Sequence, residues 1–277
     1  MNWQHCSIKQ GPDTLPNPLV PKDGVWRVSA HKLNMMRKCP FSLYLYLSRF
    51  PSADSDRSYL SCGNAVHDYA EELTKGCAKE PEYYLGKYEV PQLNSDGVDI
   101  HKRFYTCIEN VPEYALQEGG IPERTEYTSF TTPKGRNCRL ETRIDLQLED
   151  SQLKECKGKV IVDYKTGSHV KNNNEYKLQA QCYLFAKKGE YKALFVSMLD
   201  PSEYFVIDSS PADYIPKLCD EYIDTVLMHD FERKMDFNCP RFCPYYQMYC
   251  KDEYAKCQQL IVPEEAQAEA GHDDSEN

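Results

Sequence analysis

The chain has 277 residues, of which 41% are hydrophobic, and it carries a formal net charge of −10 at pH 7. This composition excludes an intrinsically disordered chain, and the length suits one large domain or two small ones. The acidic total does not exclude nucleic acid as a partner, because a local basic groove can lie beside a carboxylate metal site that is negative until the metal binds.

The part of the chain that follows residue 23 is predicted to begin with helices. A polar, proline-rich stretch over residues 1–23 is expected to form an irregular arm. Apolar residues then recur at helical spacing, and Ser29 can cap the first helix. Helices are predicted over Ala30–Lys38, Phe41–Phe50, Gly63–Lys75 and Ile100–Leu116, with a loop over Pro81–Gly97.

The hydrophobic period changes to that of β-strands from residue 126 onward. A three-stranded meander is predicted over Glu126–Thr132, Arg139–Leu148 and Val160–Tyr164, and further strands over Ala193–Leu199 and Tyr204–Ile207. Helices are predicted over Glu175–Lys188 and Ala212–Arg233. This order of elements predicts an α/β (α+β) fold with a mixed sheet.

The ends of the chain and its cysteines predict domain organisation and location. One domain is expected over residues 24–262, followed by an acidic tail over residues 263–277 that has six acids and no Lys or Arg. Such a tail has too little apolar surface to order itself. An odd number of cysteines, 13, and the lack of a signal-like or bilayer-spanning segment predict a reducing compartment. We therefore expect a cytoplasmic protein without membrane contact, bacterial or, if phage-encoded, in the host cytoplasm.

The stretch VIVDYKTGS, residues 160–168, contains the first candidate residues of a catalytic site. Side chains two apart on a strand point the same way, so Asp163 and Lys165 share a face. Asp145 lies in the preceding strand, where a hairpin can bring it beside Asp163. Paired carboxylates repel unless a cation neutralises them, and oxygen ligands suit Mg²⁺ or Mn²⁺. Asp163 and Lys165 alone would suggest a strand-end ion pair, but the second acid favours a metal site at which Lys165 assists hydrolysis.

An ordered set of motifs resembles a known nuclease family. The motifs are Gly63-x3-His67 on a helix, Asp145, Asp163-x-Lys165 and Gln179-x3-Tyr183. Their order and spacing resemble the RecB-like branch of the PD-(D/E)xK nuclease superfamily, which includes the CRISPR-associated exonucleases, over about residues 39–250. The resemblance implies a restriction-endonuclease-like core over about residues 60–210, with a central mixed sheet flanked by helices.

The resemblance also implies roles for single residues. It assigns metal binding to His67, Asp145, Asp163 and the backbone carbonyl of Tyr164, and catalysis to Lys165 together with Asp145, Asp163, Gln179 and Tyr183. Gln179 and Tyr183 are four residues apart on a helix, so they share a face with Tyr176. We expect this stripe to be an exposed edge, because Leu178, Cys182 and Phe185 form a separate core-facing stripe.

A second constellation consists of cysteines from both ends of the domain. Cys39, Cys239, Cys243 and Cys250 could place four thiolates around one centre, which suits a [4Fe–4S] cluster or a structural zinc. In the resembling family such cysteines hold a [4Fe–4S] cluster, which implies a helical subdomain built from residues 30–50 and 212–257. Both gaps in the C-terminal trio are one residue longer than the family pattern, so Cys257 is a reserve ligand. Zinc and unligated thiols are the alternatives, and other cysteines such as Cys62, Cys107 and Cys182 are predicted to be core residues.

Basic residues near the predicted turns are candidates for phosphate contacts. They are Lys134, Arg136, Arg139 and Lys171. Each could equally be the solvated charge that any surface turn carries. Exposed tyrosines could stack on single-stranded bases, and no element suited to reading base edges is apparent.

The residues and the resemblance together predict a Mg²⁺- or Mn²⁺-dependent deoxyribonuclease. The resemblance implies exonuclease action on single strands or DNA ends, in recombination, repair, replication or CRISPR/phage DNA processing, with protein partners in a DNA-processing complex. One alternative is a catalytically inactive DNA-binding or scaffold protein that keeps the fold. Another is a nuclease that acts on RNA.

Overall fold

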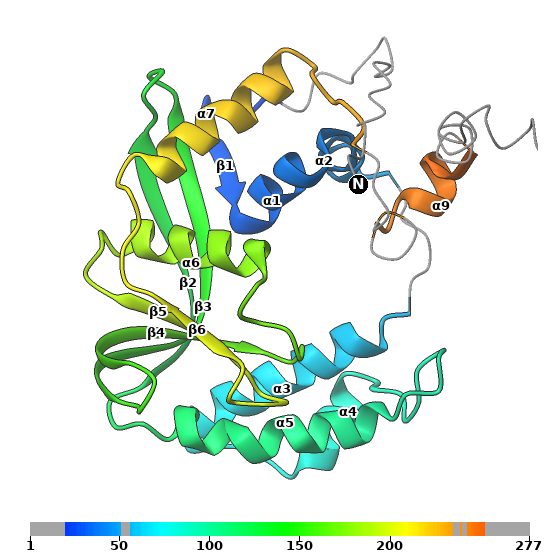
Figure 1. Ribbon diagram of the computed structural model, residues 1–277, viewed down its shortest axis with the longest axis vertical. Helices are drawn as coiled ribbons and strands as arrows, with labels where there is room; N and C mark the ends of the chain where they lie inside the picture. The colour runs from blue at the N-terminus through cyan, green and yellow to red at the C-terminus, as the bar shows by residue number, and fades with distance from the viewer. Residues whose placement is uncertain (1–19, 51–55, 235–238, 240–242, 253–277) are drawn as a thin grey trace, which may run out of the picture.

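The computed structural model describes residues 20–50, 56–234, 239 and 243–252. Most of the predicted N-terminal arm, the predicted acidic tail and Cys257 lie outside these residues. The described chain forms a six-stranded sheet in the order β1-β3-β4-β5-β6, and β2 pairs with β3 (Figure 1). The strands are β1 (Trp26–Ser29), β2 (Ile121–Thr131), β3 (Asn137–Gln152), β4 (Lys157–Lys165), β5 (Lys192–Ser197) and β6 (Tyr204–Ile207).

The sheet is mixed, as the sequence predicts. β2, β3 and β4 are antiparallel neighbours, which confirms the predicted meander. β4 pairs with β5 in parallel through a crossover, and β1 pairs in parallel with the start of β3. Parallel neighbours need a long connection between them, and residues 174–186 supply it as a helix between β4 and β5.

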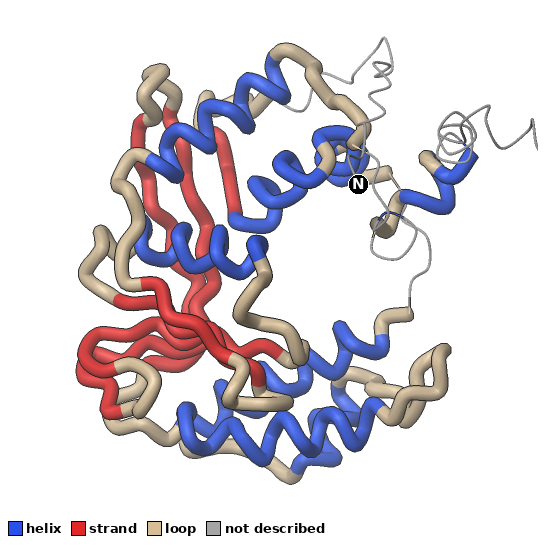
Figure 2. Tube along the Cα trace, viewed as in Figure 1, coloured by secondary structure: helices blue, strands red, loops and turns tan. Residues whose placement is uncertain are grey.

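Helices cover the sheet in separate groups (Figure 2). They are α1 (Ala30–Lys38), α2 (Pro40–Leu47), α3 (Ser58–Thr74), α4 (Pro81–Lys87), α5 (Ile100–Ala115), α6 (Asn174–Ala186), α7 (Tyr214–Leu227) and α9 (Tyr246–Tyr249). α3 and α5 share one hydrophobic cluster with β4 and β5. α1, α2 and α7 share a second cluster with the start of β3. α6 lies on the sheet between these groups. The result is the mixed α/β architecture expected of a restriction-endonuclease-like fold.

Side-chain caps define where several of these helices begin. Ser29 accepts a hydrogen bond from the backbone N–H of Lys32 at the start of α1, and Asp99 does the same for Lys102 in α5. Asn173 caps α6 in the same way, which fixes the first turn of the helix that carries Gln179 and Tyr183.

Three described elements were not predicted from the sequence: β1, α4 and the four-residue helix α9. β1 was not predicted, because it has only four residues and is stabilised by pairing with β3, which is distant in sequence. α4 lies within the stretch predicted as a loop; Pro81 occupies its first turn, where a proline costs no hydrogen bond.

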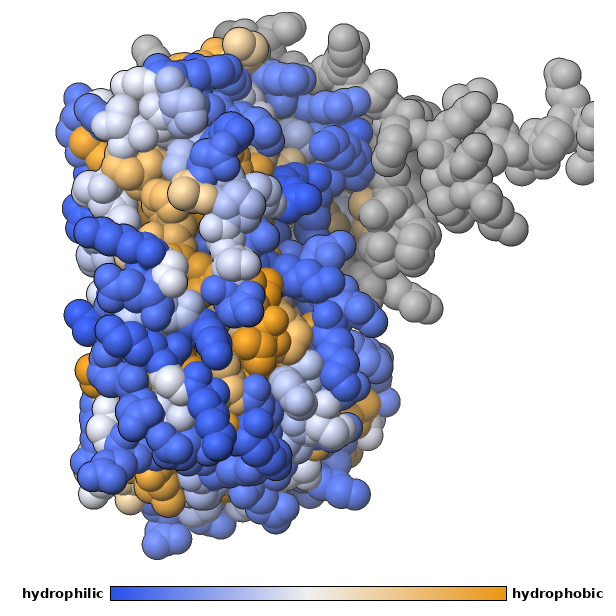
Figure 3. All heavy atoms as spheres, turned by 60° about the vertical axis from the view of Figure 1, so that its left-hand side comes forward, coloured by the Kyte–Doolittle hydropathy of each residue, from blue (hydrophilic) through white to orange (hydrophobic). Residues whose placement is uncertain are grey.

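One face of the molecule is largely polar. Hydrophilic side chains cover most of the face shown in Figure 3, and hydrophobic side chains gather there only in small patches. None of the described helices combines the length and the apolar composition needed to cross a bilayer.

Candidate active site

The two predicted carboxylates lie where β3 and β4 separate. β4 pairs with β3 only as far as Leu146 and Val162, and Asp145 and Asp163 come directly beyond this pair. Both line a cavity of about 400 Å³ at the fork. Other cavity residues are His67 from α3, Lys165 at the end of β4 and Gln179 from α6. The structure therefore gathers five of the predicted site residues around one cavity.

His67 and Asp145 form the first pair in this cavity. His67 Nδ1 lies 3.2 Å from Asp145 Oδ1, and the other carboxylate oxygen accepts a 2.8 Å hydrogen bond from the backbone N–H of Tyr164. Asp145 is thus held from α3 on one side and from β4 on the other. The predicted use of the Tyr164 carbonyl as a metal ligand stays a prediction, and the phenol ring of Tyr164 is buried in the core.

Asp163 and Lys165 form the second pair, and α6 holds both. Lys165 Nζ lies 2.5 Å from Asp163 Oδ1 and donates a 3.1 Å hydrogen bond to Gln179 Oε1. The amide nitrogen of Gln179 donates to Asp163 Oδ2 at 2.9 Å, and the hydroxyl of Tyr183 contacts the same oxygen at 2.7 Å. Gln179 and Tyr183 therefore fix the orientation of the acid and the lysine.

The charges in the cavity shift each other's pKa values. Burial raises the pKa of Asp145, but the charges of His67 and Lys165 outweigh it and hold this pKa below its ordinary value. Burial raises the pKa of Asp163 above its ordinary value, although Lys165 opposes the shift. Burial lowers the pKa of Lys165, but Asp163 and Asp145 raise it more. Lys165 is therefore a protonated, nearly enclosed cation.

The donor atoms at the fork fit a divalent cation. Asp163 Oδ1 is fully buried and makes no hydrogen bond of normal geometry, even though Lys165 Nζ is close to it. An imidazole and two carboxylates supply ligand types that Mg²⁺ and Mn²⁺ accept. Across the described ranges, no three His, Cys, Asp or Glu side chains form a ready-made metal group. At this site the two acids lie in separate pairs, Asp145 with His67 and Asp163 with Lys165.

Neighbouring elements hold the end of β4 in place. Lys165 Nζ lies 4.6 Å from the ring centre of Tyr176 and 5.1 Å from that of Phe195, so aromatic faces line the ammonium. Arg103 of α5 hydrogen-bonds to the carbonyl of Thr166 directly after Lys165. Gly63 of α3 lies against the same residue, because a Cβ at Gly63 would be 3.4 Å from Thr166 Oγ1.

The helix face that carries Gln179 and Tyr183 is not an exposed edge, which corrects the expectation from the sequence. Tyr183 is 1% exposed and packs in a cluster with Ile161 and Phe195. The opposite stripe of α6 is also covered, because Leu178 packs with residues of α1 and α7. α6 is thus enclosed on two sides, a situation that helical spacing alone does not reveal.

Sequence reasoning missed several residues that line the cavity. They are Asn64, Asp68, Glu71, Tyr88, Glu123 and Arg143. Arg143 precedes Asp145 by two residues on β3, so strand alternation could have indicated it. Glu123 hydrogen-bonds to Arg143 Nε at 2.6 Å, and only the register between β2 and β3 brings these two together.

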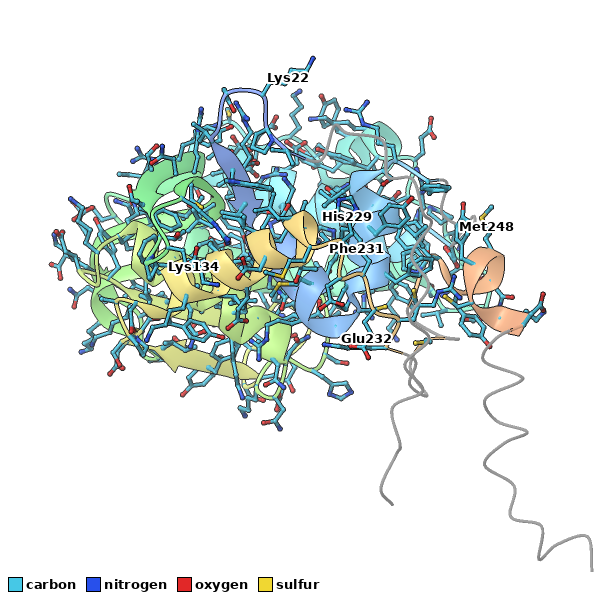
Figure 4. The ribbon with its side chains drawn as sticks, turned by 90° about the horizontal axis from the view of Figure 1, so that it is seen from above. Lys22, Lys134, His229, Phe231, Glu232 and Met248 are labelled. Atoms are coloured by element: carbon cyan, nitrogen blue, oxygen red, sulfur yellow. The ribbon has the colours of Figure 1, made fainter. Side chains whose placement is uncertain are left out.

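The four predicted phosphate contacts lie outside the cavity lining. Lys134 is ion-paired with Asp224 of α7 at 2.5 Å, and Figure 4 shows Lys134 beside that helix. Arg136 is paired with Asp224 as well and also contacts Asp220. These two contacts tie the β2–β3 turn to α7, which favours a structural role. The remaining two residues are Arg139, which lies over the ring of Tyr127, and Lys171, which is paired with Glu203.

Three of the four predicted cluster cysteines lie at one hydrophobic cluster. Cys39, Cys243 and Cys250 pack against the cluster formed by α1, α2 and α7. Burial raises the pKa of Cys250 to about 11; Arg233 opposes this shift, and Cys243 and Cys39 add to it. The fourth, Cys239, lies with its sulfur 3.8 Å from the carbonyl of Lys234.

Among the residues that the structure places, no three of Cys39, Cys239, Cys243 and Cys250 form a metal-binding group. Cys62, Cys107 and Cys182 are fully buried, which confirms that they are small core residues.

Two solved structures are similar to this chain at low sequence identity. The protein SSO0001 has 12% identity and a TM-score of 0.42, covering 82% of this chain and 86% of its own. A protein from Eubacterium rectale named "Putative exonuclease" has 9% identity and a TM-score of 0.45, covering 82% of this chain and 91% of its own. No curated protein matches the chain.

A family model gives a much firmer assignment. The model of the PD-(D/E)XK nuclease superfamily matches residues 27–251, which include all residues of the cavity and the strands of the sheet apart from Trp26, the first residue of β1. The chain therefore belongs to the PD-(D/E)XK nuclease superfamily.

Proposed function

We propose that the protein is a metal-dependent deoxyribonuclease that acts as an exonuclease on single-stranded DNA or DNA ends. The observation that carries this proposal is the fork between β3 and β4, where His67, two acids and a nearly enclosed lysine line one cavity. A structural ion pair would not require both acids, a histidine and a glutamine around open space. Buried carboxylates beside a lysine suit phosphodiester hydrolysis.

His67, Asp145 and Asp163 would hold the divalent cation, with the carbonyl of Tyr164 as a further ligand. When bound, such a cation lowers the pKa of a coordinated water and neutralises charge on the phosphoryl oxygens. Lys165 holds the attacking water or counters the charge that builds on the phosphate. Gln179 and Tyr183 hold the side chains of Lys165 and Asp163 in their orientations through the hydrogen bonds described above.

The proposal is tested by incubating end-labelled single-stranded DNA with the protein in Mn²⁺ and in EDTA. We expect cleavage from one end in Mn²⁺ and none in EDTA, because the acids repel an incoming phosphate unless a cation is bound. Products released as mononucleotides or short oligonucleotides would support exonuclease action. A protein that is inert under both conditions would support the scaffold alternative, and faster cleavage of an RNA strand of the same sequence would support the RNA alternative.

We also propose that Cys39, Cys239, Cys243 and Cys250 bind a [4Fe–4S] cluster, with zinc as the alternative and Cys257 as a reserve ligand. The support is chemical: four thiols suit such a cluster, and three of them lie at the hydrophobic core that joins α1 and α2 to the C-terminal segment. A cluster there would close a loop of about 200 residues and so stabilise the fold.

Protein purified without oxygen is expected to be brown, and Cys250→Ser is expected to lose the colour and to unfold at a lower temperature. Visible absorbance and iron analysis measure the first effect, and a thermal melt measures the second. Cys182→Ser is the matched control, because Cys182 is a buried thiol outside the proposed ligand set. Colourless wild-type protein that contains zinc would support the alternative metal.

A further inference from the structure

One open side of the ribbon formed by β2 and β3, which β1 flanks at residues 138–141, leads away from the cavity. Strand alternation and the register between β2 and β3 place Thr125, Tyr127, Ser129, Arg139, Glu141 and Arg143 on this side, which we call the ribbon face. The other side of the same strands is covered, because Cys138 and Leu140 are buried against the helices. The ribbon face is the uncovered continuation of the strand that carries Asp145.

Arg143 is the first residue of the ribbon face beside the cavity. It lies two residues from Asp145, lines the cavity, and has a side chain that is 65% exposed. Glu123 engages its Nε and Nη2 atoms, so the guanidinium is oriented while its other N–H groups remain for a ligand. A guanidinium fork held in this way suits a phosphate.

A second cation is combined with an aromatic ring farther along the same face. The guanidinium of Arg139 lies 4.2 Å from the ring centre of Tyr127, and Tyr127 is 54% exposed. A nucleobase can stack on such a platform, and the neighbouring cation can bind the phosphate that follows. Arg139 and Arg143 are four residues apart on one strand, which places them about 13 Å from each other.

Two acids, Glu141 on the ribbon face and Glu123 beside it in the cavity lining, are offset by nearby cations. Glu123 is paired with Arg143, and Glu141 interacts electrostatically with Lys32 of α1. Arg143 is ion-paired, as Arg136 of the adjacent turn is, but its side chain is 65% exposed, whereas that of Arg136, which is held by acids of α7, is 22% exposed. Arg139 and Arg143 are therefore the cations that the ribbon face presents to a polyanion.

We infer that a single nucleic-acid strand leaves the cavity along the ribbon face, with Arg143 and Arg139 on its phosphates and a base stacked on Tyr127. This inference rests on the proposed nuclease function and specifies the path of its substrate. The path favours a single strand, because stacking on Tyr127 requires a base that is free of its own neighbours. It extends about 20 Å from Asp145 to Arg139 at the rise of a β-strand.

The test measures binding separately from cleavage. A fluorescein-labelled oligothymidylate of about 20 nucleotides, longer than typical single-strand sites, is titrated with the full chain in EDTA, and anisotropy gives the affinity at several salt concentrations. Arg143→Gln and Arg139→Gln are each expected to weaken binding about 3- to 10-fold and to lower the salt slope by about 0.7. Tyr127→Ala is expected to weaken binding on the order of tenfold with little change in slope.

Two matched controls come from elsewhere on the surface. Tyr83 is also an exposed tyrosine, 41% exposed, with Lys79 3.7 Å from its ring centre, and Lys154 is an exposed, ion-paired lysine near the other end of β3. Tyr83→Ala and Lys154→Gln are expected to bind like wild type. Thermal melts confirm that each variant is folded; Arg139→Ala, Arg143→Ala or Tyr127→Leu replaces the corresponding variant if it is not.

The possible outcomes distinguish a failure of the proposed strand path from a failure of the proposed nuclease function. If all three ribbon variants bind like wild type while Mn²⁺-dependent cleavage persists, the path is wrong and the nuclease proposal stands. If only Arg143→Gln weakens binding, the substrate is confined to the cavity and the path is again wrong. If Tyr127→Ala weakens binding to a duplex of the same length as strongly, stacking of a single strand is contradicted. Loss of both binding and cleavage in wild type overturns the proposed function itself.

Discussion

Replacing Lys165 with alanine is expected to lower the rate of DNA cleavage in Mn²⁺ by about 10²- to 10⁴-fold, the range for a positioned proton-transfer or charge-stabilising group. DNA affinity in EDTA is expected to change little. The reason is that the ammonium is directed at Asp163 and Gln179 and is only 15% exposed, so it offers little surface to a binding strand. Single-turnover cleavage measures the first effect and fluorescence anisotropy the second.

Lys187→Ala is the matched control for this experiment. Lys187 is also nearly buried, at 12% exposure, and is paired with Glu126 near the far end of α6, outside the cavity lining. Its removal is expected to lower stability but to leave the cleavage rate of the folded enzyme close to that of wild type. Equal cleavage rates for wild type and Lys165→Ala would place the chemistry elsewhere in the molecule.

Local spacing was sufficient to predict most of the helices and strands. The helix predicted over Ala30–Lys38 has those bounds in the structure, because its cap and its apolar spacing are both local signals. β1 is the opposite case, since four residues carry little pattern and their partner, the start of β3, is more than a hundred residues away. The local hydrophobic pattern of a sequence cannot predict a strand that is stabilised by pairing with residues far along the chain.

In the candidate site, too, local spacing predicts some residues, whereas others are brought to the site only by tertiary contacts. Asp163 and Lys165 could be found together because a strand repeats every two residues. The contact between His67 and Asp145 joins a helix to a strand, and only the family resemblance suggested it. Glu123 could not be found at all, because its role depends on the register of β2.

The basic turn between β2 and β3 illustrates how tertiary contacts change the meaning of a charge. In the sequence, Lys134 and Arg136 look free to bind phosphate. In the structure, Asp220 and Asp224, which lie far along the chain on α7, neutralise them. A charge run therefore predicts a binding surface only after its ion-pair partners are known.

Asp163→Ala is expected to lower the free energy of unfolding by about 3 kcal/mol in EDTA, because it leaves the ammonium of Lys165 nearly enclosed without its closest counter-ion. The Asp163 side chain is 2% exposed and accepts hydrogen bonds from Gln179 and Tyr183, which also lose their acceptor. Urea unfolding of Asp163→Ala, Lys165→Met and the double variant measures the coupling. Asp163→Asn replaces Asp163→Ala if the latter does not fold.

The double variant is expected to be more stable than the sum of the single effects predicts, since it removes both buried charges together. The exposed pair of Lys171 and Glu203, 49% and 31% exposed, serves as the reference and is expected to show a coupling of less than about 1 kcal/mol. Mn²⁺ is expected to raise the stability of wild type but not of Asp163→Ala, because only wild type retains the full ligand set. Additive effects of Asp163→Ala and Lys165→Met would mean that the two side chains are not a coupled buried pair. Equal stabilisation of wild type and Asp163→Ala by Mn²⁺ would mean that Asp163 is not part of a metal site.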